Sequence, residues 1–189
     1  MHRAKALELL REHARQSLGP EESAAVRQTV SFIGRHPDCL LRSCLPGHLT
    51  GSAWIVSPDG LRVLLTHHLK LGKWLQLGGH ADGDSDLLAV ALREAREESG
   101  LASLRVLRPG LYDVDRHWIP ARGGEPGHWH HDLRFLLAAD PGQPLTVTGE
   151  SRDLAWVEIG SVTALNPEES MARMVRKTPP PQAGGAGAP

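Results

Sequence analysis

One stretch, residues 78–101, constrains the fold of this chain more than any other, because it combines paired glycines, an acidic loop and one helix. Alanine and leucine, both strong helix formers, dominate its second half. Asp84, Ser85 or Asp86 can cap the start of the helix, since a short side-chain oxygen accepts from free backbone N–H groups. Gly100 is the expected stop, because a left-handed residue commonly follows the end of a helix.

Three glutamates of this helix are spaced so that their carboxylates share one face. Glu94, Glu97 and Glu98 stand at i, i+3 and i+4. Arg93 and Arg96 could relieve the repulsion between them, which would leave an ordinary solvated charged face. The glycine entry and the acidic loop favour a metal site instead, because Mg²⁺ binds through carboxylates, waters and substrate phosphates.

The same residues resemble the Nudix box, G-x5-E-x7-R-E-U-x-E-E-x-G-U, in which U is a bulky apolar residue. Gly79 matches its first glycine, and residues 93–101 match its end, except that Ala95 is small for a bulky apolar position. One position departs, because the first glutamate of the motif falls on Ser85. In the family this glutamate mainly braces the arginine, so the resemblance implies that Asp84 or Asp86 substitutes for it.

The resemblance to the Nudix hydrolase superfamily also implies a fold and a reaction. The fold is an α/β Nudix fold, with a mixed β-sheet in an α/β/α sandwich. The reaction is Mg²⁺-dependent (or Mn²⁺-dependent) hydrolysis of the diphosphate linkage of a nucleoside diphosphate linked to another moiety. The implied metal ligands are the Gly78 carbonyl and the carboxylates of Glu94, Glu97 and Glu98, while Arg93 orients a box carboxylate.

An acidic loop over residues 148–153 offers a further catalytic group. Nudix enzymes often supply another glutamate from such a loop, so Glu150 is the candidate and Asp153 the alternate. Either Glu94 or Glu150 would activate the attacking water. An ordinary polar turn is the competing interpretation of this loop.

Two histidine-containing segments are candidates for substrate contacts. A basic loop after the strand 61–67 contains His67, His68 and Lys70, which could contact phosphate or form only a solvated hairpin. In the strand 129–138, alternation continued back to residue 128 gives one polar face, which consists of His128, His130, Asp132 and Arg134. That face could line the substrate pocket, hold a histidine-rich metal site or simply be exposed.

Two other functions remain open. Isopentenyl-diphosphate isomerases share the fold and bind metal through histidines and glutamates, and the Gly-Gly-His start at residues 78–80 is slightly similar to theirs. No cysteine lies beside His80, however, so their proton-transfer residue is missing. A non-catalytic module that senses a nucleotide is the other alternative, and its sequence support is the departure at Ser85.

Two cysteines and two histidines form a second unusual segment. His36, Cys39, Cys44 and His48 follow the spacing H-x2-C-x4-C-x3-H. Four such ligands could coordinate zinc tetrahedrally. The competing interpretation is a linker with two inert thiols, since the spacing is irregular and crosses two prolines.

Composition limits the class and location of the protein. A length of 189 residues with 40% hydrophobic residues suits one domain with a real core. The formal net charge of −1 gives no strong attraction to nucleic acid or membrane. No apolar run approaches a membrane span, and the two cysteines suit a reducing cytoplasm. We therefore expect a cytoplasmic enzyme that acts on a small molecule.

Three regions are expected along the chain. Apolar periodicity over residues 4–18 and 21–32 predicts two helices, so residues 1–35 form an N-terminal extension that packs on the domain or builds a homodimer contact. Residues 36–178 form the Nudix domain, and residues 179–189 a disordered tail. Within the domain, strands are expected at 50–57, 61–67, 74–77, 104–117, 129–138 and 154–159, and a last helix from Asn166 to about Lys177.

Overall fold

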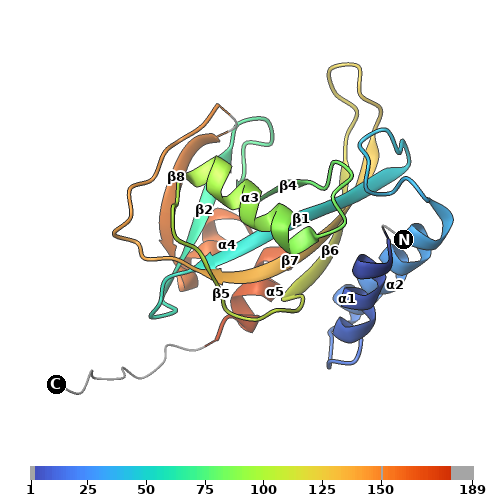
Figure 1. Cartoon of the computed structure of the whole chain (residues 1–189). Helices are drawn as coiled ribbons and strands as arrows, with labels where there is room; N and C mark the ends of the chain where they lie inside the picture. The colour runs from blue at the N-terminus through green and yellow to red at the C-terminus, as the bar shows by residue number, and fades with distance from the viewer. Residues whose placement is uncertain (1–2, 150, 180–189) are drawn as a thin grey trace. The chain divides into compact units, whose positions relative to one another are not determined.

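The computed structural model of the protein describes residues 3–149 and 151–179, and these adopt the expected mixed α/β fold (Figure 1). The helices and strands follow one another along the chain in one continuous order. That order is α1 (Ala4–His13), α2 (Pro20–Arg35), β1 (Gly47–Val56), β2 (Arg62–His68), β3 (Trp74–Leu75), β4 (Leu77–His80), α3 (Leu87–Ser99), β5 (Arg105–Val106), β6 (Asp113–Ile119), β7 (His128–Ala138), β8 (Ser151–Glu158), the short 3₁₀ turn η1 (Ile159–Ser161), α4 (Val162–Leu165) and α5 (Glu169–Lys177).

The described residues fall into two compact units. The first contains residues 3–53, 78–94 and 108–135, and the second contains residues 54–77, 95–107, 136–149 and 151–179. Strands β1 and β7 and helix α3 each contribute residues to both units. No helix of the described residues is both long enough and apolar enough to cross a membrane.

In the first unit, the two N-terminal helices are tied to each other and to β6. His13 of α1 and Glu22 of α2 form a buried hydrogen bond of 2.7 Å. The same Glu22 carboxylate accepts from the backbone N–H of Val114 in β6, at 3.3 Å. Helix α2 thus packs against β6 (Figure 1). This contact is of the first kind expected for the N-terminal helices, namely packing on the domain.

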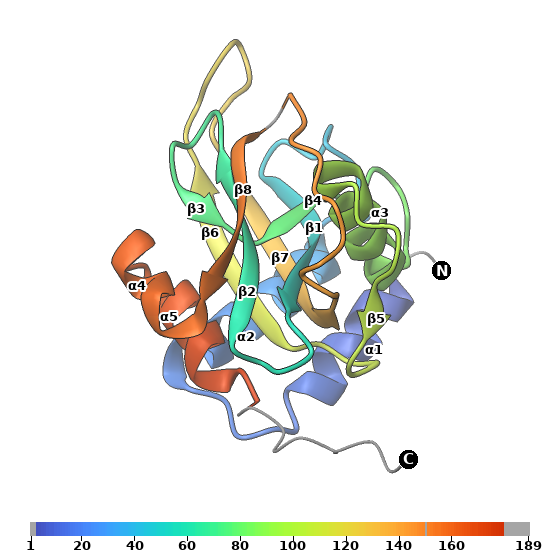
Figure 2. The same cartoon turned by 90° about the vertical axis from the view of Figure 1, so that its left-hand side faces the viewer.

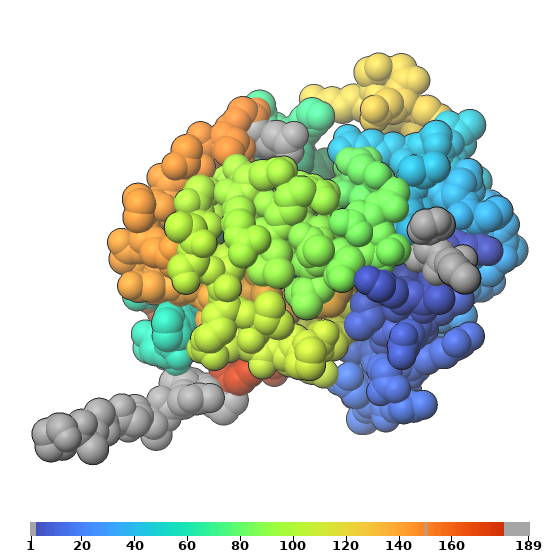
Figure 3. Space-filling view, viewed as in Figure 1, coloured from blue at the N-terminus to red at the C-terminus, as the bar shows by residue number. Residues whose placement is uncertain are grey.

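The hairpin of β6 and β7 forms one side of the first unit. The strands pair antiparallel from Asp113↔Arg134 to Ile119↔His128. The loop that joins them extends beyond the strand ends in both ribbon views (Figures 1 and 2). In the space-filling view this loop, in yellow, stands beside the light-blue segment that precedes β1 (Figure 3). The two segments are joined by a hydrogen bond, because the Trp129 N–H donates to the Pro46 carbonyl at 3.2 Å.

The second unit is built around β2. This strand pairs antiparallel with β8 from Arg62↔Glu158 to His67↔Asp153, and with β3 at Thr66↔Leu75. Helices α4 and α5 follow β8 and lie together (Figure 2). The Trp54 indole donates to Thr178 Oγ1 at 3.0 Å, just after the end of α5.

Two strand predictions are wrong in their limits. The single strand expected over 104–117 is divided into β5 and β6, because the segment between them contains Pro109 and Gly110, a pair typical of turns. The strand expected to begin at Leu154 begins at Ser151, whose hydroxyl lies 2.6 Å from the Thr66 hydroxyl of β2. Most of the tail predicted for 179–189 lies outside the described residues.

The predicted ends of the box helix are confirmed. Asp86 Oδ1 accepts from the Ala89 N–H at 3.1 Å, so Asp86 caps α3. Asp84 Oδ1 accepts from the Asp86 N–H at 2.8 Å and shapes the entry. Gly100 has φ +73° and donates to the Arg96 carbonyl at 2.8 Å, which is the left-handed ending that glycine favours.

Replacing Asp86 by Ala is expected to lower the free energy of unfolding by about 1 kcal/mol, because the Ala89 N–H loses its acceptor. Urea denaturation midpoints of the purified proteins measure this change. Asp86→Asn is the matched control, since its side-chain oxygen can still accept and most of the stability should return. Equal losses in the two variants would contradict the capping role.

Candidate active site

Helix α3 carries the three glutamates of the acidic motif on one continuous helix. Glu94, Glu97 and Glu98 therefore share a face, as their spacing predicts. Their exposure differs, because Glu98 is buried, the Glu94 side chain is 17% exposed and Glu97 is exposed. This face is partly enclosed rather than fully solvated, which suits a site more than a surface helix.

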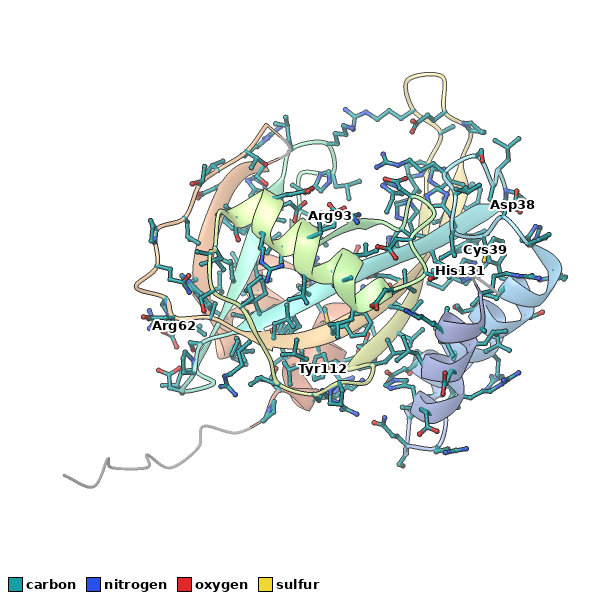
Figure 4. All side chains as sticks on the ribbon, viewed as in Figure 1. Asp38, Cys39, Arg62, Arg93, Tyr112 and His131 are labelled. Atoms are coloured by element: carbon teal, nitrogen blue, oxygen red, sulfur yellow. The ribbon has the colours of Figure 1, made fainter. Side chains whose placement is uncertain are left out.

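The carboxylate of Glu94 is held against the turn that opens the motif. A Cβ atom at Gly79 would lie 2.4 Å from Glu94 Oε2, so only glycine allows this approach. The Arg93 guanidinium donates to Glu94 Oε1 at 2.8 Å and to the His80 carbonyl at 3.1 Å (Figure 4). The expectation that Arg93 orients a carboxylate of this motif agrees with these two bonds.

The two aspartates expected to substitute for the missing motif glutamate make their contacts at the start of α3. The Asp84 carboxylate bonds the backbone at the start of α3. The Asp86 carboxylate caps that helix and pairs with Lys5 at 3.5 Å. Arg93 donates to Glu94 and to the His80 carbonyl. Short aspartates at a helix start satisfy backbone N–H groups, which competes with reaching an arginine farther along.

A family comparison agrees with this arrangement of glycine, arginine and glutamate. The sequence profile described as "NUDIX domain" matches residues 48–178, well over half of the chain. The chain belongs to the NUDIX domain family. This membership places the protein among the Nudix pyrophosphohydrolases. A search of curated proteins finds no match.

Solved structures share the Nudix fold with this chain. A Caenorhabditis elegans Ap4A hydrolase is 18% identical with a TM-score of 0.56, over 68% of this chain and 93% of its own. A Clostridium perfringens hydrolase of the NUDIX family is 23% identical with a TM-score of 0.54, over 69% and 95%. The Escherichia coli dihydroneopterin triphosphate pyrophosphohydrolase is 16% identical with a TM-score of 0.54, over 68% and 92%.

The predicted basic loop of the Nudix domain lies in the second unit. His67 of β2 stacks on Trp74, with ring centroids 5.2 Å apart. His68 Nδ1 accepts from the backbone N–H groups of Lys70 and Leu71 at 3.2 and 3.3 Å. His68 therefore shapes its own loop, while the Lys70 side chain is exposed.

The predicted loop glutamate cannot be placed. Glu150 lies outside the described residues. Its alternate, Asp153, lies within β8 opposite His67 and not in a loop, and its Oδ1 accepts from the Leu154 N–H at 2.8 Å. The acidic loop expected over 148–153 therefore gives way to a strand at Ser151.

The two predicted histidines of β7 belong to a larger group, which we call the histidine cluster. It consists of His48, His80, His117, His128 and His130. Its members come from β1, β4, β6 and β7, and all lie in the first unit. The sequence pattern groups His48 with the cysteine segment and gives His80 and His117 no role, because residues far apart in the chain meet only when the strands pair.

Burial keeps several rings of the histidine cluster neutral. Burial, with the nearby His128 and Arg42 charges, lowers the pKa of His48 to about 4. Burial and Arg42 lower the pKa of His80 to about 4 as well. The pKa of His130 is held well below its ordinary value by burial and by neighbouring histidines. These imidazoles are therefore neutral at pH 7 and keep a lone pair.

The four residues of the H-x2-C-x4-C-x3-H segment do not form one site in the described part of the chain. His36 and Cys44 approach Asp38, with ligand atoms within 4.8 Å of one another. His48 belongs to the histidine cluster instead, and Cys39 is fully buried (Figure 4). Burial raises the pKa of both thiols to about 11, which suits inert cysteines.

The two polar residues that follow the histidines in β7 do not line a pocket, contrary to one interpretation of this strand face. Asp132 and Arg134 are buried, and Arg134 Nε donates to Asp132 Oδ2 at 2.8 Å. Asp132 also accepts from the hydroxyls of Thr50 and Ser52 in β1, at 2.8 and 2.7 Å. These residues form an ion-pair network between the strands of the first unit.

His131→Ala is expected to lower the free energy of unfolding by about 1–3 kcal/mol with kcat and KM nearly unchanged. His131 faces α2, where its ring stacks on Phe32 at 4.2 Å and its Nδ1 bonds the Thr29 hydroxyl at 2.9 Å. Thermal melts and steady-state kinetics on one preparation measure both effects. A raised KM with an unchanged melting temperature would contradict this placement of the ring.

Proposed function

We propose that the chain is a Mg²⁺-dependent hydrolase that cleaves the diphosphate linkage of a nucleoside diphosphate joined to another group. The observation that carries this proposal is the Glu94 carboxylate, which Arg93 fixes against Gly79 on the face that also bears Glu97 and Glu98. Three carboxylates and the Gly78 carbonyl offer only oxygen donors, which fit Mg²⁺ and also Mn²⁺.

Each residue of the box has a role in this proposal. Glu94, Glu97, Glu98 and the Gly78 carbonyl would hold the ion, and the bound ion would neutralise charge on the phosphate oxygens. Water attacks one phosphorus of the diphosphate. The bond between that phosphorus and the bridging oxygen breaks, and the departing oxygen keeps the electron pair. Glu94 or Glu150 would accept the proton of the water, while Arg93 positions Glu94.

A substrate panel tests the proposal. The Ap4A hydrolase and the dihydroneopterin triphosphate pyrophosphohydrolase motivate dinucleoside polyphosphates and triphosphates as its first members. Oxidised nucleoside triphosphates, ADP-ribose and nucleotide sugars complete it. Each compound is incubated with Mg²⁺ or Mn²⁺, and phosphate-containing products are identified by mass spectrometry, with H₂¹⁸O to mark the phosphorus attacked.

Each outcome of the panel selects one function. Products of diphosphate cleavage that require the divalent ion support the hydrolase. Binding of a nucleotide without turnover would indicate a sensor, and the hydrolase proposal would then be wrong. Isomerised prenyl diphosphate without release of phosphate would indicate the isomerase, for which the cysteine beside His80 is missing.

A further inference from the structure

The histidine cluster is separate in chemistry from the carboxylates of the box, and the proposed hydrolysis does not use it. Six pairs of its rings have centroids between 4.8 and 5.4 Å apart. Five imidazoles converge from four strands here, one of them buried and four half-buried, and each carries polar nitrogens that must find partners. The partners of these nitrogens decide what the cluster can bind.

His48 is the most informative member. The residue is 3% exposed, and neither of its ring nitrogens makes a hydrogen bond of good geometry in the described part of the structure, although the Cys44 backbone lies close enough to act on the ring. An imidazole buried with both nitrogens unpaired costs free energy. Its ring lies 4.8 Å from those of His80, His128 and His130, so what it faces is more imidazole. A shared cation would satisfy His48 and its neighbours together.

His128 and His117 are arranged as metal-ligating histidines commonly are. His128 Nδ1 lies 2.9 Å from the Pro126 carbonyl, to which it can donate, and this leaves Nε2 with its lone pair. His117 Nδ1 lies 3.1 Å from Asp115 Oδ2, which likewise leaves its Nε2 free to ligate. A carbonyl or carboxylate behind the ring fixes the tautomer and raises the basicity of the ligand.

The distances within the cluster suit one ion. His128 Nε2 and His130 Nε2 are 3.2 Å apart. Two nitrogens bound to one tetrahedral Zn²⁺ stand about 3.3 Å apart, given bond lengths of about 2.0–2.1 Å. A hydrogen bond between the two rings would also explain this pair, but it would leave His48 unsatisfied. His48, His128 and His130 offer ligand atoms that all lie within 4.8 Å of one another.

We propose that the histidine cluster binds one transition-metal ion of the Zn²⁺ type through His48, His128 and His130, with His80 or His117 as the fourth ligand. Neutral imidazole nitrogens favour such ions over Mg²⁺, which prefers oxygen. The site adjoins the Nudix box in the chain, because His80 follows Gly79 directly and its carbonyl accepts from Arg93. The protein would then hold two chemically different cation sites.

Metal titration of the full chain tests this site without any nucleotide. The protein is stripped with a chelator, dialysed into buffer containing excess Mg²⁺, and titrated with Zn²⁺ against a chromophoric chelator. One Zn²⁺ per chain is expected. His128→Gln and His130→Gln should each weaken Zn²⁺ binding at least about 100-fold, since losing even an outer partner of a ligand costs 10–100-fold. Because His128 is only partly buried, its replacement should leave the fold intact.

Three matched variants should retain Zn²⁺ binding. His131→Gln changes the neighbouring ring on the opposite face of β7. Cys44→Ser removes the thiol of the other candidate group, His36, Asp38 and Cys44. Glu97→Gln alters the box alone. Substitution with Co²⁺ adds a spectroscopic readout, because visible ligand-field bands without a sulfur charge-transfer band indicate nitrogen ligands.

Several results would overturn the metal site. Zn²⁺ binding that is lost in Cys44→Ser and kept in His128→Gln would place the ion at the thiol group. Binding that is lost in Glu97→Gln would place it at the box. A wild-type protein that binds no Zn²⁺ would leave the cluster as a hydrogen-bonded core. None of these results depends on turnover, so failure of the hydrolase proposal and failure of this one are distinguishable.

Discussion

Replacing Glu97 by Gln is expected to lower kcat by about 100-fold or more while the protein stays folded. The side chain is exposed on α3, so a neutral isostere should disturb packing little. It removes one charged oxygen from the proposed Mg²⁺ ligands, and charge stabilisation of the phosphate is the main contribution that such a site makes. Glu98→Gln should reduce kcat similarly, and because Glu98 is buried this replacement should also lower the stability of the protein.

Steady-state kinetics on a substrate identified by the panel, with thermal melts of the same samples, measure this prediction. Arg96→Gln is the matched control, because Arg96 is an exposed charged residue one position before Glu97 and lies outside the proposed site. Its kcat should remain within about twofold of the wild type. Near-normal turnover in Glu97→Gln and Glu98→Gln together would show that the three glutamates form only a solvated face.

Replacing Arg134 by Met is expected to destabilise the protein by about 3–5 kcal/mol. Arg134 Nη1 and Nη2 donate to Asp113 and Asp115, each at 3.2 Å, and Nε donates to Asp132. Burial opposes the charge of this guanidinium, but the carboxylates of Asp115, Asp132 and Asp113 together raise its pKa. Methionine would leave two fully buried carboxylates without their cation.

Denaturant unfolding measures the loss, and the stability of the variant should improve as the pH falls far enough to protonate the carboxylates that have lost the guanidinium. The direction of this pH dependence follows from burial. A buried carboxylate without a cation has a raised pKa, so it binds a proton more tightly in the folded state than in the unfolded state. Arg105→Met is the matched control, since Arg105 is an exposed arginine on strand β5. Equal changes in the two variants would contradict a structural role for the Arg134 network.

The double hydroxyl contact of Asp132 explains why this network belongs to the core and not to a pocket. Thr50 and Ser52 lie two residues apart on β1, so both side chains lie on one face of the sheet and reach the same carboxylate of the neighbouring strand β7. Period-2 alternation in β7 was correctly predicted, because His131 lies against α2 while His130 joins the histidine cluster. Alternation assigns residues to a face, but it does not indicate whether that face is covered.

The sequence by itself determined the features that depend on neighbouring residues. The caps of α3, its glutamate spacing and its glycine ending are local, since each involves residues within a few positions. The family motif is local in the same sense. Such features need only backbone geometry and side-chain propensity, and they were sufficient to indicate the Nudix fold.

Only the tertiary structure decided which distant residues meet. The His48 ring packs against His80, His128 and His130 and does not form one site with the two cysteines near it in sequence. Strand pairing causes this grouping, because it brings β1, β4 and β7 together. The tertiary structure also brought the Arg93 guanidinium to the Glu94 carboxylate and the His80 carbonyl. Burial and strand register across the sheet determine the partner of a buried polar group. Neither can be inferred from the spacing of residues along the chain.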